Sequence, residues 1–238
     1  MSPFKTDRPV IVALDAASGQ QALRLLEHLD PALCRVKVGK ELFTAEGPAI
    51  VERLVKRGYP VFLDLKFHDI PNTVAAACRV AASLGVWMLD VHVSGGRAML
   101  MAARDALERF PEATRPRLVG ITLLTSLSEQ AIEEVGMRGP LASAVLKLAR
   151  LAHESQLDGV VCSAAEAAML REAIPSPFML VTPGIRLPDN APDDQSRVVT
   201  PLDAWRAGAS YLVVGRPITQ SQDPSVTLER INRMLEQN

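Results

Sequence analysis

Short runs of β-branched and other apolar residues alternate with longer stretches rich in alanine, leucine and glutamate along the chain. The runs have the length and composition of strands, and the stretches between them have the apolar periodicity of helices. No two runs follow each other through a hairpin turn. We therefore predict strands, joined by helical crossovers, over Val10–Asp15, Arg35–Lys40, Val61–Phe67, Met88–Ser94, Arg117–Thr125, Asp158–Ser163, Phe178–Ile185 and Tyr211–Ile218.

Strict alternation of strands and helices implies a parallel sheet, and eight such units indicate that the sheet closes on itself. A doubly wound open sheet is the alternative, and it predicts a glycine-rich GxGxxG loop after the first strand. The residues there, LDAASGQ, lack that pattern. The predicted fold is therefore α/β, a single-domain (β/α)8 or TIM barrel over residues 1–238, a length that such barrels commonly occupy as one domain.

The net charge, the apolar runs and the cysteines indicate which classes of protein this sequence can belong to. The formal net charge is −1 and aromatic residues are 4%, which does not favour a nucleic-acid-binding surface. No apolar run approaches the roughly 20 residues of a membrane span, and the start of the sequence lacks the apolar core of a signal peptide. Cys34, Cys78 and Cys162 are odd in number and widely spaced, as in proteins of a reducing cytosol. We expect a soluble cytoplasmic protein without nucleic-acid or membrane partners.

Two longer insertions interrupt the regular alternation. The residues after Thr125, SLSEQAIEEVGMRGP, predict a short additional helix. The segment Leu187–Pro201 is rich in proline, aspartate and asparagine and has little apolar periodicity, so it is predicted to be a loop. Long loops at the carboxyl ends of barrel strands often cover a binding site, which suggests a mobile lid here.

The stretch VFLDLKFHDIPNT, residues 61–73, starts as a buried strand but carries Asp64, Lys66 and Asp69. Side chains alternate along a strand, so Asp64 and Lys66 are expected on one face, with Lys37 of the preceding strand beside them. Buried charges are costly unless they are paired, so this cluster is either a structural ion-pair network or a site. Further residues lie at or just after the ends of other predicted strands, which favours a site at the carboxyl end of the barrel: Asp15, Thr125, Arg186, Gly215 and Arg216.

The segment DLKFHDIPNT closely resembles the signature of the orotidine 5′-monophosphate decarboxylase family, whose core reads Asp-x-Lys-x-x-Asp. Related phosphosugar decarboxylases and synthases share that core, so the core alone is only moderately specific. The resemblance extends over nearly the whole chain, through ALDAAS, RVKVGKELF, DVHVSGG, ITLLTS, TPGIR, DDQSRVVTP and VVGRPIT. It implies decarboxylation of orotidine 5′-monophosphate to uridine 5′-monophosphate in pyrimidine synthesis, with no cofactor and no metal.

The resemblance also implies roles for individual residues. The charged network around the reacting carbon would consist of Lys37, Asp64, Lys66 and Asp69, with Lys66 as the proton donor. The small-molecule substrate would contact Asp15, Lys37 and Thr73 through its ribose, Thr125 through its pyrimidine, and Arg186, Gln195, Gly215 and Arg216 through its phosphate or the covering loop. Members of the family are homodimers with shared sites, so Asp69, Ile70 and Thr73 are expected to reach into the partner's site.

Two alternatives remain open at this point. A metal-assisted phosphosugar lyase on the same barrel would share Asp64, Lys66 and Asp69 but would need a Mg²⁺ ligand set and no pyrimidine contact. His92, two residues after Asp90, could suggest such a set together with Asp64, but no convincing further ligands are visible, so we expect no metal. A non-catalytic nucleotide-binding protein is the second alternative, and the complete Lys-Asp-Lys-Asp set argues against it.

Overall fold

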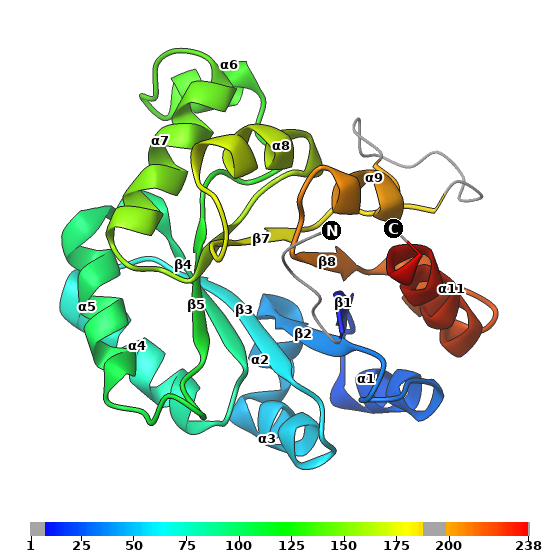
Figure 1. Ribbon diagram of the computed structural model, residues 1–238. Helices are drawn as coiled ribbons and strands as arrows, with labels where there is room; N and C mark the ends of the chain where they lie inside the picture. The colour runs from blue at the N-terminus through cyan, green and yellow to red at the C-terminus, as the bar shows by residue number, and fades with distance from the viewer. Residues whose placement is uncertain (1–7, 188–198, 238) are drawn as a thin grey trace.

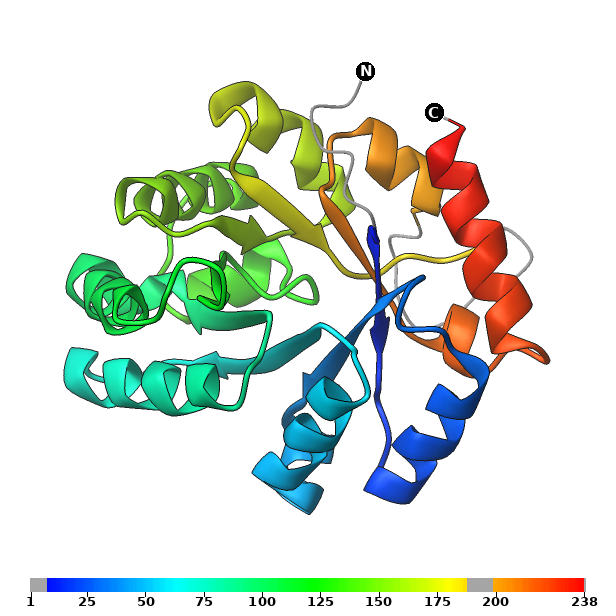
Figure 2. The same ribbon diagram turned by 60° about the horizontal axis from the view of Figure 1, so that its bottom comes forward.

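Eight parallel strands form a closed barrel in the computed structural model, which describes residues 8–187 and 199–237. Each strand pairs with its neighbours in the sequence, and β1 closes the barrel against β8, so segments from opposite ends of the chain lie side by side (Figures 1 and 2). The predicted (β/α)8 barrel is confirmed. The strands are β1 (Val10–Ala13), β2 (Arg35–Gly39), β3 (Val61–Phe67), β4 (Met88–His92), β5 (Arg117–Ile121), β6 (Gly159–Val161), β7 (Met179–Thr182) and β8 (Tyr211–Val214).

Helices surround the barrel on its outside, as Figure 2 shows. They are α1 (Gly19–Leu25), α2 (Lys40–Glu46), α3 (Pro48–Lys56), α4 (Pro71–Ser83), α5 (Gly96–Glu108), α6 (Glu129–Glu134), α7 (Leu141–Glu154), α8 (Ala164–Ala173), α9 (Pro201–Arg206), α10 (Arg216–Thr219) and α11 (Pro224–Glu236), with short 3₁₀ turns η1 (Leu26–His28) and η2 (Val93–Gly95). Proline opens α3, α4, α9 and α11, where its missing N–H costs no helical hydrogen bond. No helix within the two described ranges is both long and apolar enough to cross a membrane.

Alternating side chains divide the apolar residues into two cores. Outward-facing residues such as Val10 and Val12 of β1 pack between the barrel and the helices. Inward-facing residues such as Ile11, Phe62 and Met88 fill the barrel interior. The interior is therefore a packed core rather than a pore, so a ligand site is expected at an end of the barrel.

The amino end of the barrel is closed by stacked rings and a cation. The Arg35 guanidinium lies over the Trp87 ring at 4.4 Å and over the Tyr211 ring at 5.1 Å, measured to the ring centroids. Arg35 also donates to the carbonyl of Arg8. Arg35 and Tyr211 are the first residues of β2 and β8. These contacts close the barrel interior at its amino end.

The predicted strand starts agree with the structure to within one residue, but most predicted ends were wrong. β3 alone matches at both ends, while β5 stops at Ile121 rather than Thr125, and β7 at Thr182 rather than Ile185. Residues Arg216–Ile218, predicted as strand, belong to α10. The polar, glycine and proline residues at these ends leave the hydrogen-bonded ladder and turn into the loops that carry the site.

The structure describes the first predicted insertion and only the ends of the second. The additional helix after Thr125 is present as α6, and the Ser128 hydroxyl caps it by accepting from the Ala131 N–H. Most of the predicted loop, residues 188–198, lies outside the described residues, and so does Gln195. Beyond it, Val199 forms a bridge to Ile185, and Thr200 caps α9.

Candidate active site

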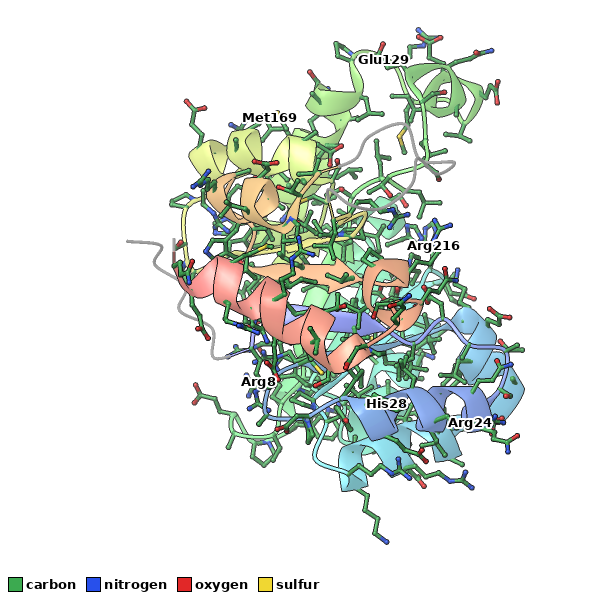
Figure 3. The ribbon with its side chains drawn as sticks, turned by 90° about the vertical axis from the view of Figure 1, so that its right-hand side faces the viewer. Arg8, Arg24, His28, Glu129, Met169 and Arg216 are labelled. Carbon is green, nitrogen blue, oxygen red and sulfur yellow. The ribbon has the colours of Figure 1, made fainter. Side chains whose placement is uncertain are left out.

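A cavity of about 300 Å³ opens at the carboxyl end of the barrel. Its charged and polar lining residues come from the ends of β1, β2, β3 and β8 and from the loops after β5 and β7: Asp15, Lys37, Asp64, Lys66, Thr125, Arg186 and Arg216. Figure 3 shows Arg216 near the end toward which the β8 arrow points, and Arg8 toward the other end of the barrel. Residues spread over 200 positions of sequence therefore meet in one place because parallel strands end together.

Two lysines and two aspartates form an alternating row of charges along one wall of this cavity. Lys37 Nζ lies 3.3 Å from Asp15 Oδ1 and 3.3 Å from Asp64 Oδ2. The Lys66 ammonium pairs with the other oxygen of Asp64, Oδ1. Asp64 thus bridges the two lysines, as the sequence predicted for residues on adjacent strands.

The protonation of this row is set by the charges themselves. Burial alone would raise the pKa of Asp64, but Lys37, followed by Asp90 and Lys66, lowers it to about 2. Burial would also lower the pKa of Lys37, yet Asp64 and Asp15 outweigh it and raise that pKa above its ordinary value. At neutral pH Asp64 is therefore an anion and Lys37 a cation, and both charges are available to a bound ligand.

Lys66 reaches the cavity through an irregular backbone. Its φ is +54°, in the left-handed region that residues with a side chain rarely adopt, and the pairing of β3 with β4 changes register between Leu63 and Phe67. The Lys66 N–H donates to Asp90 Oδ1 at 2.8 Å. Simple alternation predicted the correct face of the strand for Lys66. The exact position of its side chain is set by the bulge, a feature that commonly directs a side chain toward a site.

The rest of the lining combines a hydroxyl, arginines and an apolar surface. Thr125 and Arg186 line the cavity, and Arg186 is 9% exposed. Gly215 also lines it, directly before Arg216. Sequence reasoning missed the apolar part of the lining, although most of it occupies inward positions of the predicted strands: Ala13, Phe62, Ile121, Leu123, Leu124, Val161, Pro183 and Val213.

Three predicted site residues lie away from the cavity of their own chain. Asp69, Ile70 and Thr73 are exposed and are not part of its lining, and the Asp69 carboxylate accepts the Ile70 N–H at 2.6 Å. The chain turns outward here because Pro71 starts α4. Of the four charged residues in the predicted network, the structure brings together Lys37, Asp64 and Lys66, whereas Asp69 faces solvent.

The histidines beside the site do not form a metal-binding group. The His68 and His92 rings lie 5.3 Å apart between centroids, next to β3 and β4. Burial, followed by His68, Lys66 and Lys40, lowers the pKa of His92. Within residues 8–187 and 199–237 there is no group of three or more His, Cys, Asp or Glu side chains that could hold a metal ion.

Comparisons with known proteins agree with one another. The model of the orotidine 5′-phosphate decarboxylase / HUMPS family matches residues 8–231. The orotidine 5′-phosphate decarboxylase of Laribacter hongkongensis is 57% identical over 225 residues, 94% of this chain and 91% of the relative. The enzyme of that name from Chromobacterium violaceum is 56% identical over 229 residues, 96% of this chain and 92% of the relative.

Solved structures give the same result at the level of the fold. The crystal structure of orotidine 5′-phosphate decarboxylase from Lactobacillus acidophilus is 41% identical and superposes with a TM-score of 0.87, covering 96% of this chain and 99% of that one. The enzyme from Pyrococcus horikoshii is 22% identical, with a TM-score of 0.77 over 95% of this chain and 99% of that one. The second likeness shows that the barrel is retained at low identity.

Proposed function

Because this chain belongs to the orotidine 5′-phosphate decarboxylase / HUMPS family, we propose that it is a carboxy-lyase that converts orotidine 5′-monophosphate to uridine 5′-monophosphate and CO₂. The reaction belongs to pyrimidine synthesis, and we assign the protein to the cytoplasm. The observation that carries the proposal is the row of Lys37, Asp64 and Lys66 along one wall of the cavity. Its volume of about 300 Å³ lies at the lower end of the range for small-molecule sites.

The row of charges supplies the charge stabilisation that this reaction requires. Loss of CO₂ from C6 of the pyrimidine leaves a carbanion with no neighbouring carbonyl group placed to take up the electrons. A fixed cation at that position stabilises the developing negative charge without reorganisation of solvent. We assign this role to Lys66, which then donates a proton to C6, so that protein side chains supply the chemistry and no cofactor is needed.

Asp64 acts on both the lysines and the substrate in this proposal. Its two oxygens hold Lys37 and Lys66, which fixes the ammonium groups in place. Its low pKa keeps it ionised, so it also presents a negative charge to the carboxylate of the substrate. That repulsion is relieved when CO₂ leaves.

The remaining lining residues bind the parts of the substrate that do not react. Asp15 and Lys37 bind the ribose hydroxyl groups, and Thr125 contacts the pyrimidine. The phosphate is bound by Arg186 and Arg216, with the Gly215 backbone approaching closely and Gln195 covering it. Binding energy gained at the phosphate can be used to organise the charged row around C6.

The active unit in this proposal is a homodimer whose sites are shared. Each site takes Lys37, Asp64 and Lys66 from one chain and Asp69, Ile70 and Thr73 from the partner. Exposed apolar side chains on α4, on the adjacent α5 and next to Asp69 support this arrangement: Ile70 is 67% exposed, Val80 on α4 62%, and Met101 on α5 48%. Apolar side chains gathered on two packed helices are typical of a surface that is covered by a second copy.

A turnover assay in the presence of EDTA tests the proposed activity. We expect the protein to convert orotidylate to uridylate at an unchanged rate after exhaustive chelation, because the charged row supplies what a metal would otherwise supply. The absorbance change of the pyrimidine follows the reaction directly. Loss of activity with EDTA and its recovery with Mg²⁺ would reassign the chain to the metal-assisted phosphosugar lyases that share Asp64, Lys66 and Asp69.

The substitution Arg216→Ala tests the assignment of the phosphate site. We expect kcat/KM for orotidylate to fall by about 10²-fold or more, since the cationic contact to the phosphate dianion is lost. The slow reaction of phosphate-free orotidine should be nearly unchanged. The matched control is Arg233→Ala on α11, where Arg233 pairs with Glu229 on the outer surface. Equal losses with both substrates would mean that Arg216 supports the fold and that the phosphate binds elsewhere.

A further inference from the structure

Asp90 is a buried carboxyl group directly beneath the charged row. Its side chain is completely buried. Phe62 of β3 pairs with Met88 of β4, and both face the barrel interior. Two residues further along each strand, Asp64 and Asp90 therefore point to the same interior side, as alternation requires. Asp90 thus lies beside Asp64 on the adjacent strand.

The two oxygens of Asp90 have different surroundings. Oδ1 accepts the Lys66 N–H at 2.8 Å. Oδ2 is buried and receives no hydrogen bond from a donor group in the part of the chain that the structure describes. An unsatisfied buried carboxylate oxygen is costly, and such an atom in a native fold requires an explanation.

A proton on Asp90 accounts for the burial of its carboxyl group and for the position of that group beside the Asp64 carboxylate. Two carboxyl groups can share a hydrogen bond only if one of them is protonated. Asp64 has two ammonium partners, Lys37 and Lys66, and is therefore the better anion of the two. Burial first, and then the Asp64 charge, raise the pKa of Asp90 well above its ordinary value, and the same contact helps to lower the pKa of Asp64.

We propose that Asp90 is a positioning residue in the form of a neutral carboxylic acid, which donates a hydrogen bond from Oδ2 to Asp64 and accepts the Lys66 N–H at Oδ1. In this way one side chain holds the two central members of the charged row. It fixes the Asp64 carboxylate from below, and it stabilises the left-handed backbone that aims the Lys66 ammonium into the cavity. The effect on turnover rests on the proposed decarboxylase function, whereas the protonation state of Asp90 does not.

The protonation state can be tested without any activity measurement, through the stability of Asp90→Asn. An asparagine keeps one donor and one acceptor at this place but cannot ionise. The charged groups that act on Asp90 are Asp64 and Lys66 of β3, and the Asp90 charge in turn acts on the buried Cys78 thiol of α4, on the helix side of the strand. Because the folded chain holds the proton and the unfolded chain releases it above about pH 3.8, wild-type stability falls as the pH rises toward the folded-state pKa of Asp90.

We therefore expect the melting temperature of Asp90→Asn to rise relative to wild type between about pH 5 and pH 8. The exposed Asp105→Asn on α5 is the control, and its difference from wild type should stay nearly constant over that range. The infrared band of a buried protonated carboxylic acid should be present in wild type and absent in Asp90→Asn. A constant difference for Asp90→Asn, or a wild type without this band, would show that Asp90 is ionised and would overturn the proposal.

The positioning role is tested by comparing Asp90→Asn with Asp90→Val. Valine matches the size of aspartate and suits a strand, but it makes neither hydrogen bond. We expect kcat for orotidylate to fall by about 10²-fold in Asp90→Val with KM little changed, because a small displacement of Lys66 is sufficient for such a loss. Asp90→Asn should recover most of that loss. Equal kcat values for the two variants would contradict the positioning role, while inactive wild-type protein would instead contradict the proposed function.

Discussion

Replacing Lys66 by alanine is expected to lower kcat for orotidylate by at least about 10⁴-fold, because the variant loses both the fixed cation and the proton donor. The substitution leaves Asp64 paired with Lys37 at 3.3 Å, so the rest of the row keeps a charge partner. The loss should therefore appear in kcat, with the fold intact. Steady-state kinetics and circular dichroism of the same preparation measure these two quantities.

Lys66→Arg separates the two contributions of this side chain. An arginine keeps the positive charge but does not release a proton in the accessible pH range. We expect Lys66→Arg to remain severely impaired, although less so than a variant without any charge. Lys56→Ala, an exposed position on α3, is the matched control and should behave as wild type. A Lys66→Ala enzyme that keeps a tenth or more of the wild-type kcat would remove Lys66 from the proposed chemistry.

Two inactive variants, Lys66→Ala and Asp69→Ala, are expected to restore activity when their subunits exchange. The proposal assigns Lys66 to one chain and Asp69 to the partner at each site. A mixed dimer then contains one site with both residues intact and one site with neither. At equal concentrations half of the dimers are mixed, so the recovered activity should approach about a quarter of that of wild type.

The control for this mixing experiment is the pair Lys66→Ala and Asp64→Ala. Both residues come from the same chain at each site, so every site in the mixed dimer lacks one of them, and no activity should return. Mass spectrometry of the mixtures verifies that subunits have exchanged. Verified exchange without recovery for Lys66→Ala and Asp69→Ala would mean that Asp69 does not act in the partner's site.

Most of the fold could be predicted from the sequence because its signals are local. Strand and helix periodicities are set by residues a few positions apart, and the lack of hairpin turns leaves parallel crossovers as the remaining connection. The same local rules place strand ends poorly. The predicted strands extend to Thr125 and Ile185, yet β5 and β7 end at Ile121 and Thr182, since the last residues leave the ladder to form the site.

The charged row was also predictable in outline. Charged residues in an apolar strand must be paired or functional, and alternation together with strand order brings Lys37, Asp64 and Lys66 to one wall. The sequence thus determined which side chains meet at the carboxyl end of the barrel. Asp69 lies apart from Lys66 in the structure, because Pro71 starts α4 and the chain turns outward there.

Only the tertiary structure decided how Lys66 and Asp90 are arranged. The left-handed conformation of Lys66 and the register shift beside it depend on a hydrogen bond from one strand to a buried carboxyl group on the next, 24 residues away. No role for Asp90 was predicted from the sequence. Its surroundings are created by folding, and both the energetic cost of burying its carboxyl group and the charge of Asp64 beside it exist only once β3 and β4 have paired.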